Sequence, residues 1–308
     1  MPIRFLTYEQ IDLEKWDQCV LQSHAGLIYS SSIFLNHMAA NWSALVLDDY
    51  AAVMALPWKR KWGLSYIYPP AFTQQLGICA AEIVAEQMVN DFMNAIPAKF
   101  KFIEANLNNG NAALGQFQLR KNYVLLLDKD FSVLQKNFSR SANRNIVKAK
   151  EQQIVVAENA DPLQVLQMHR ERFKDGIGSN AEDYQRLQSL IKKLQTAGSI
   201  YCITARKVEG AVIAGSIFTL YKDRVTFLIN GNTPESLANG ATHLLMHHCI
   251  QYFSGRSLFL DFEGSDNPAF ARFYEQYGAT PEHYPFIRRN RLPWPIKLLK
   301  PADDANHF

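Results

Sequence analysis

The segment from Asn267 to Ala279 constrains the fold of this chain more than any other. It follows an apolar, strand-like run at residues 257–261, and Gly278 near its end favours helix termination. Its aromatic residues recur at helical spacing: Phe270, Phe273, Tyr274 and Tyr277. The segment therefore predicts a short helix with one aromatic side, preceded by a strand and a polar turn.

Length and composition limit the other possibilities. With 308 residues, 48% hydrophobic and 20% charged, the chain is long enough for two domains and typical of a soluble globular protein. No apolar run approaches the ~20 residues that cross a bilayer, so we expect no membrane span. The net charge of +3 does not by itself indicate nucleic acid, and nothing indicates an oligomeric state. The scattered cysteines favour reduced thiols and a cytoplasmic location: Cys19, Cys79, Cys202 and Cys249.

Periodicity and turn residues predict a regular element order in the C-terminal half. The expected helices are 162–173, 181–197, 241–253 and 269–277. The expected strands are 153–157, 199–206, 211–221, 224–230 and 257–262. The resulting order is β-α-α-β-β-β-α-β-α.

The N-terminal half repeats this order more loosely. Its expected strands are 4–7, 43–47, 50–58, 75–79, 101–105 and 123–127, and its expected helices are 13–22, 32–42 and 81–96. A repeated order of elements implies duplication. We therefore expect one domain at residues 1–128 and another at 129–308, with residues 285–301 as a tail that packs back on the body.

The C-terminal motif resembles the last motif of the GNAT acyltransferase superfamily. The resemblance rests on Asn267, on Phe273-Tyr274-Glu275 and on Gly278 after a strand, and the element order also matches the GNAT layout. Two such domains in tandem resemble the FemABX family of cell-wall peptidyl and aminoacyl transferases and the wider FemAB-like acyltransferase group. Further segments that carry the resemblance are 16–17, 68–77, 141–149, 239–245 and 261–265.

This resemblance implies an α/β (α+β) fold of tandem GNAT-like domains. Each domain would be a mixed, mostly antiparallel sheet flanked by helices. The N-terminal domain would be a degraded copy, because the features at Tyr274 and at the helix start near Gly240 occur in only one half.

The resemblance also implies an N-acyltransferase that forms an amide from an activated acyl donor and an amine. The donor would be acyl-CoA or, as in the cell-wall transferases, aminoacyl-tRNA, so tRNA is a possible partner. The acceptor would be a small-molecule or nucleotide-linked amine. Two departures keep the donor open: Asn239-Gly240-Ala241 has no neighbouring arginine, and Tyr274 stands where the cell-wall transferases usually have lysine. A third possibility is a non-catalytic binding protein with the same fold.

The start of the helix near Gly240 is the expected site for the donor. Unpaired N–H groups at a helix start attract phosphate, and small residues allow it to approach the backbone. Glycine and threonine are also ordinary capping residues, so both interpretations remain open. The positions expected to contact the donor are Asn230, Gly231, Asn239, Gly240, Ala241, Thr242 and Asn267.

Three residues are candidates for catalysis. In the GNAT motif, Tyr274 would protonate the leaving group, whereas otherwise its ring belongs to the core. Asp261 and Glu263 lie near the end of the strand that precedes the motif helix, and alternate residues share one strand face. They would assist the amine, or they would cap the following turn.

A basic stripe and a glutamine pair are the expected substrate contacts. Lys136, Arg140, Arg144 and Lys148 recur every four residues, either as a solvated helix face or as a site for an anionic partner. Gln74 and Gln75 lie in the family-like segment 68–77 and are expected to contact substrate.

No metal is expected. His243 and His247 are spaced to share one helix face, and His248 is adjacent. Zinc would need a further ligand, and no cysteine or carboxylate lies at a recognisable spacing.

Overall fold

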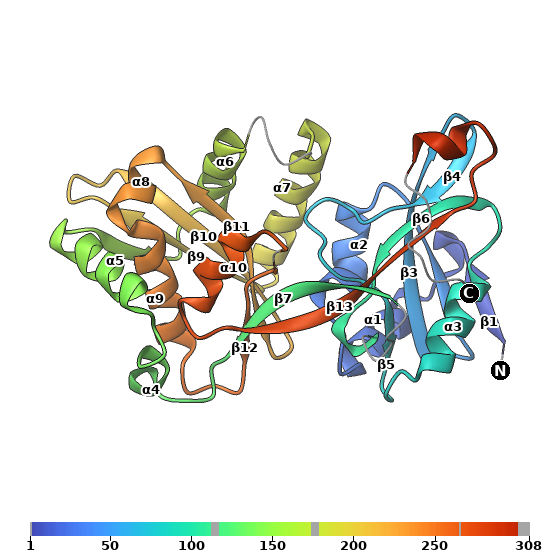
Figure 1. Ribbon diagram of the computed structural model, residues 1–308, viewed down its shortest axis with the longest axis horizontal. Coiled ribbons are helices and arrows are strands. Elements are labelled where there is room, and N and C mark those ends of the chain that lie inside the picture. Colours follow the sequence, from blue (N-terminus) through green and yellow to red (C-terminus); the bar gives the residue numbers. More distant parts are fainter. Residues whose placement is uncertain (1, 112–116, 174–178, 265, 301–308) are drawn as a thin grey trace. The chain divides into compact units, whose positions relative to one another are not determined.

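The computed structural model describes residues 2–111, 117–173, 179–264 and 266–300 (Figure 1). Internal contacts divide the chain into two compact units. The first unit comprises the chain up to Lys121 together with the chain from His283, and the second unit comprises Asn122–Glu282. Among the described residues, no helix has both the length and the hydropathy needed to span a membrane.

The second unit contains a mixed sheet in the order β7-β12-β11-β10-β9-β8. Its strands are β7 (Gln118–Leu126), β8 (Val155–Glu158), β9 (Ile200–Arg206), β10 (Val212–Tyr221), β11 (Arg224–Asn232) and β12 (Phe259–Asp261). Its helices are α4 (Phe131–Gln135), α5 (Arg140–Glu151), α6 (Pro162–Arg172), α7 (Ala181–Thr196), α8 (Pro234–Asn239), α9 (Ala241–Phe253) and α10 (Pro268–Glu275). Neighbouring strands are antiparallel except for β11 and β12, which are parallel.

The first unit contains a sheet in the order β1-β2-β3-β4-β6-β13, with β5 beside β3. Its strands are β1 (Ile3–Leu6), β2 (Trp42–Leu47), β3 (Ala52–Lys61), β4 (Leu64–Ile67), β5 (Ile78–Ala80), β6 (Phe100–Asn106) and β13 (Thr280–Asn290). Its α-helices are α1 (Leu13–Gln22), α2 (Ser32–Met38) and α3 (Glu86–Ala95). Here β4 and β6 form the parallel pair.

The two units share one order of elements. The run β1-α1-α2-β2-β3-β4-α3-β6 corresponds to β8-α6-α7-β9-β10-β11-α9-β12, and in each run the last two strands named are parallel neighbours. This confirms the predicted mixed, mostly antiparallel sheets flanked by helices.

The last strand of each sheet explains why the units are discontinuous. The end of β7 pairs with β12 in the second unit, and the end of β13 pairs with β6 in the first unit. The chain therefore crosses between units twice, within β7 and within β13, whereas the sequence suggested one boundary near Asp128. Residues 285–290, expected to begin a tail, belong to β13, and those from Phe286 to Asn290 have ladder partners in the first unit.

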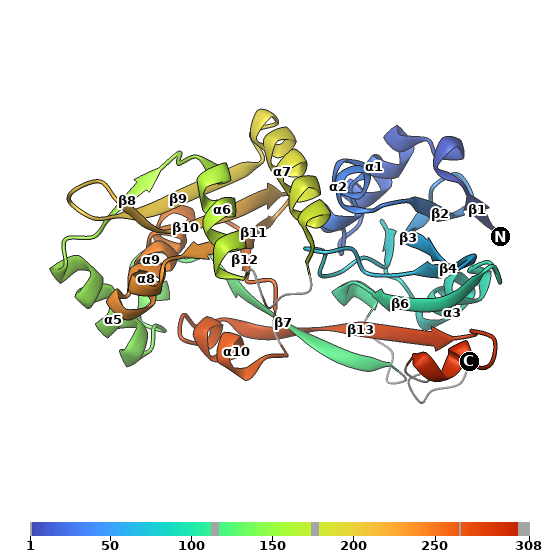
Figure 2. The same ribbon diagram turned by 90° about the horizontal axis from the view of Figure 1, so that it is seen from above.

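Helices cover both faces of the sheet in the second unit (Figure 2). On one face, α9 packs on the sheet with α5 outside it, around a core that includes Ile146, Leu245 and Leu260. On the other face, α6 lies so close to β10 and β11 that a Cβ at Gly215 or Gly231 would meet it. This close approach places α6 directly against Gly231, near the end of β11.

Side-chain caps begin several of these helices. The Asp161 side chain accepts the Leu163 N–H at the start of α6, and Asn180 and Asp183 form a capping box on α7. The same chemistry begins α8, where Thr233 caps and Pro234 follows. Residues 234–239 were not among the helices expected from the sequence, although Thr233-Pro234 is a helix-start signal.

Candidate active site

The parallel strands β11 and β12 separate soon after they begin to pair. Within the described residues, β12 pairs with β11 only from Arg224 to Thr226. β11 continues to Asn232 with β10 on its other side, and its register shifts by one residue at Leu228. A strand edge beyond its partner leaves backbone N–H and C=O groups available to an extended ligand.

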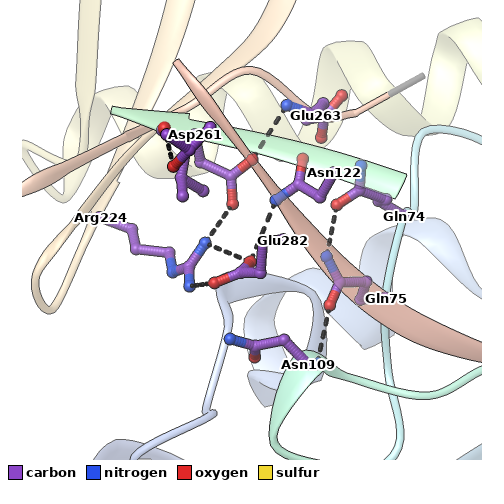
Figure 3. A network of polar contacts seen from close by, with 10 residues as sticks. Gln74, Gln75, Asn109, Asn122, Arg224, Asp261, Glu263 and Glu282 are labelled. Atoms are coloured by element: carbon purple, nitrogen blue, oxygen red, sulfur yellow. Dashed lines mark hydrogen bonds and ion pairs between the residues drawn. The ribbon is translucent and has the colours of Figure 1, made fainter. Parts of the chain in front are cut away.

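A buried ionic cluster lies at the end of β12 (Figure 3). The Arg224 guanidinium donates to Asp261 Oδ2 at 2.7 Å and to Glu282 Oε1 at 2.8 Å. Asn122 Nδ2 donates to Glu282 Oε2 at 3.3 Å. The Asp261 side chain is only 1% exposed, so Arg224 supplies the charge that burial of this carboxylate requires.

Asp261 also shapes the turn that follows the strand. Its Oδ1 accepts the Glu263 N–H at 2.9 Å. Burial raises the pKa of the Asp261 carboxyl, while Arg224 and this N–H oppose the shift. Because both carboxylate oxygens are bonded inside the protein, the geometry favours a positioning role for Asp261 over proton transfer from an amine.

Glu263 is held in an unusual backbone conformation. Its φ is +56°, in the left-handed region that costs a residue with a long side chain of order 1 kcal/mol or more. The Asp261 hydrogen bond fixes this turn, and Glu263 itself is partly exposed. Of the two predicted carboxylates, Glu263 is therefore the one that the turn presents at the surface.

Tyr274 lies beside these carboxylates. Its ring packs against Phe262 at 4.8 Å and against Tyr123 at 6.0 Å between centroids. Burial raises the pKa of the Tyr274 hydroxyl, and the negative charges of Glu263 and Asp261 raise it further. The phenol is therefore protonated at neutral pH, as a proton donor must be. The structure thus brings together the three residues predicted to be catalytic.

The start of α9 is closed rather than open. Gly240, Ala241 and Asn239 are all buried, and a Cβ at Gly240 would overlap the Asn145 carbonyl oxygen of α5. Asn239 Oδ1 accepts the Ala241 N–H at 3.1 Å. Because Gly240 has no side chain, α5 can pack closely against the start of α9. This geometry favours capping over diphosphate binding there.

The other expected donor contacts also take part in the fold. A Cβ at Gly231 would come within 2.6 Å of a carbonyl oxygen of α6, and the Asn230 carbonyl lies 3.0 Å from His169 Nδ1. Thr242 Oγ1 donates to Asn232 Oδ1 at 2.7 Å. Asn267 caps α10 by accepting the Ala269 N–H at 2.9 Å. The residues present at this helix start do not fit the diphosphate of CoA.

The basic stripe is divided between two helices. Arg140, Arg144 and Lys148 are exposed on α5, while Lys136 lies at the end of α4. Lys148 donates to the Ala238 carbonyl at 2.8 Å. The exposed face of α5 therefore retains the cationic character predicted from the sequence.

The glutamine pair belongs to the first unit. Gln75 is fully buried, where its Oε1 accepts the Asn109 N–H at 3.0 Å and its Nε2 donates to Gln74 at 2.6 Å. These contacts give Gln75 a structural role in joining two loops, and leave Gln74 as the more exposed member of the pair.

Part of this chain matches the model of a known protein family. Residues 135–279 match the family model described as "Acetyltransferase (GNAT) domain". These residues form a GNAT domain. They include α5, the diverging strands and the helix that carries Tyr274. No curated protein matched the chain.

Solved structures show that the GNAT domain belongs to a tandem fold. A crystal structure of FemX covers 97% of this chain and 99% of its own at 13% identity, with a TM-score of 0.66. L-PGS from Bacillus licheniformis covers 94% and 95% at 11% identity, and a tandem GNAT protein from the clavulanic acid biosynthesis pathway covers 95% and 99% at 10% identity, both with TM-scores of 0.54. At these identities the likeness establishes the fold alone.

The sequence did not reveal three members of the ionic cluster, Arg224, Glu282 and Asn122. Arg224 precedes an apolar strand, a position where a charge usually faces solvent. Glu282 lies in β13, which was not predicted as a strand, and Asn122 directly precedes the expected strand at residues 123–127. One signal for an ion pair was available in the sequence. Arg224 begins one strand, and Asp261 ends the strand that lies parallel to it.

A partly buried hydrogen-bond chain joins α5 and α9 to the turn that follows α10. His243 on α9 lies 2.7 Å from the Tyr277 hydroxyl through Nδ1 and 3.2 Å from Asn145 Nδ2 through Nε2. Burial lowers the pKa of His243 to about 4, and burial with nearby Lys150 lowers the pKa of His247 to about 4. Both imidazoles are therefore neutral in the folded protein near neutral pH.

These histidines should make stability depend on pH. Below the unfolded pKa of about 6.5 the unfolded chain binds protons that the folded chain does not, so the free energy of unfolding should fall as pH falls from about 6.5 to 4. Each histidine contributes at most about 1.4 kcal/mol per pH unit. His247→Phe keeps the ring contact with Phe131 and should reduce the slope near pH 5, measured by urea unfolding. An unchanged slope would contradict this assignment.

Proposed function

We propose that this protein is an N-acyltransferase that joins an activated acyl group to an amine. The observation that carries the proposal is the position of Tyr274 and Glu263 at the end of β12, where β11 continues without its parallel partner. The free edge of β11 would bind the extended arm of the donor. The GNAT domain match supports acyl transfer as the class of reaction.

Each residue has a defined task in this reaction. The nitrogen of the neutral amine attacks the acyl carbon, and Glu263 takes a proton from that nitrogen as the new bond forms. As the tetrahedral intermediate collapses, the bond to the leaving group breaks and Tyr274 gives its proton to the departing atom. Asp261 positions Glu263 through the hydrogen bond to its N–H, and Arg224 opposes the rise in the pKa of Asp261 that burial causes.

Aminoacyl-tRNA is the donor that the site favours over acyl-CoA. The start of α9 is closed by Asn145, so the site offers no cradle for a CoA diphosphate. The exposed face of α5, with Arg140 and Arg144, offers instead a surface for the phosphates of a polynucleotide. The acceptor remains an amine of the small-molecule or nucleotide-linked class.

We assign catalysis to the second unit. In the first unit, the described residues between β6 and β7 include one 3-10 turn, Asn109–Asn111, and no counterpart of α10. The proposal is therefore that the first unit is a degraded copy that supports binding.

The test is a transfer assay with both donors. Purified protein is incubated with a mixed pool of charged tRNAs or with acetyl-CoA, together with a set of primary amines, and amide products are detected by mass spectrometry. We expect amide from the tRNA pool and its loss in Glu263→Gln. Product from acetyl-CoA alone would overturn the donor assignment, and no product from either donor would favour a binding protein.

The role of α5 can be measured without knowledge of the acceptor. Arg140→Gln combined with Arg144→Gln should weaken tRNA binding and lower its salt dependence by about two phosphate contacts, because each lost contact reduces the counterions released. Lys192→Gln combined with Lys193→Gln, which removes equal charge from α7, is the matched control. Equal loss of affinity in both double variants would show that only net charge matters.

A further inference from the structure

We propose that the groove between α6 and α7 binds a small ligand that carries a carboxylate on a short apolar chain. The groove has a volume of about 240 Å³. Leu163, Leu166 and Tyr184 supply its apolar surface, while Arg170 and three glutamines supply its polar groups. This site is separate from the proposed reaction centre and does not rest on the proposed acyl transfer.

Arg170 gives the groove its preference for an anion. Its side chain is exposed, and its guanidinium carbon lies 5.9 Å from the centre of the Tyr184 ring, which also lines the groove. In the part of the chain that the structure describes, Arg170 forms no ion pair within 4.0 Å. The planar guanidinium is therefore available to bind a carboxylate through two parallel hydrogen bonds.

The acidic residues near the groove are already bonded elsewhere. Glu171 accepts from Gln167 at 2.7 Å, and Glu182 pairs with Arg186 at 2.6 Å. Asp183 belongs to the capping box of α7. These bonds hold the neighbouring carboxylates on their own helices. Among the described residues that line the groove, Arg170 is the charged one.

The remaining groups fit a carboxylate with a small apolar part. Gln185 and Gln188 lie three residues apart on α7, so their amide N–H groups can donate from the same side of that helix. No hydrogen bond joins either side chain to another described residue. The leucine and tyrosine side chains of the groove would cover a few methylene groups of the ligand. The volume of the groove suits a ligand smaller than a typical cofactor.

The groove lies on the opposite side of α6 from β11. Val165 and Met168 face Gly231, whereas Leu163 and Arg170 face the groove. An α-helix with its side chains is about 10–12 Å across, so the groove and the free edge of β11 are about one helix diameter apart. A ligand in the groove would therefore act on α6, not at the reacting atoms.

Butyrate and butyramide distinguish this site from a nonspecific groove, because they have similar size but only butyrate is charged. Binding to the full-length protein is followed by chemical-shift titration. We expect saturable binding of butyrate, no comparable binding of butyramide, and about tenfold or greater weakening of butyrate binding in Arg170→Gln.

Lys192→Gln is the charge-matched control on α7 and should bind butyrate as the wild-type chain does. Unfolding midpoints check that Arg170→Gln remains folded, as expected for an exposed side chain. Equal binding of butyrate and butyramide, or undiminished butyrate binding in Arg170→Gln, would overturn the proposal.

Discussion

Tyr274→Phe is expected to slow acyl transfer by roughly 10²–10⁴-fold with little change in donor affinity. The hydroxyl matters mainly when negative charge develops on the leaving group, so its loss should affect the chemical step rather than binding. No hydrogen bond joins this hydroxyl to another described residue, and phenylalanine keeps the ring contacts with Phe262 and Tyr123. The fold should therefore be preserved.

Single-turnover rates and donor Kd values for both proteins measure this effect. Tyr252→Phe is a suitable control, because Tyr252 is 42% exposed and stacks on Tyr201 in the same domain. An unchanged rate in Tyr274→Phe would assign Tyr274 to packing. A parallel loss of donor affinity would assign it to binding the donor.

The major elements of the GNAT domain were predictable because local signals agreed with the tertiary structure. Helix α7 has a capping box and five buried positions at helical spacing, and α9 was predicted at its observed bounds. By contrast, β4 was not predicted, since it is only four residues long. Residues 285–290 of β13 were expected to begin a tail. The partner of β13, the distant strand β6, is what makes it part of a sheet.

In the candidate site too, local features could be predicted from the sequence, whereas contacts between distant residues could not. Tyr274, Asp261 and Glu263 could be proposed as a group from the sequence because they lie within one short segment. The distribution of roles between Asp261 and Glu263 depends on Arg224, which is 37 residues from Asp261 in the chain. Gly240 shows the converse problem, since a glycine before a helix suits a phosphate or a neighbouring helix equally well. Only its contact with Asn145 distinguishes the two.

Arg224→Met should lower the free energy of unfolding by about 3–5 kcal/mol, because it leaves buried carboxylates without their cation. Asp261 is 1% exposed and Glu282 is 19% exposed, and both bond to the same guanidinium. Arg186→Met breaks the more exposed pair with Glu182 and should cost only about 0.3–0.5 kcal/mol. Urea unfolding of the two variants separates a buried cluster from an ordinary surface pair.

The pH dependence of this loss identifies its cause. Without Arg224, the folded-state pKa of Asp261 should lie further above its unfolded value, so the folded variant should bind more protons than the unfolded chain. The stability deficit of Arg224→Met relative to wild type should therefore shrink from pH 7 to pH 5, while the histidine contributions cancel in the comparison. A deficit that is independent of pH would indicate lost packing of the arginine side chain instead of uncompensated negative charge.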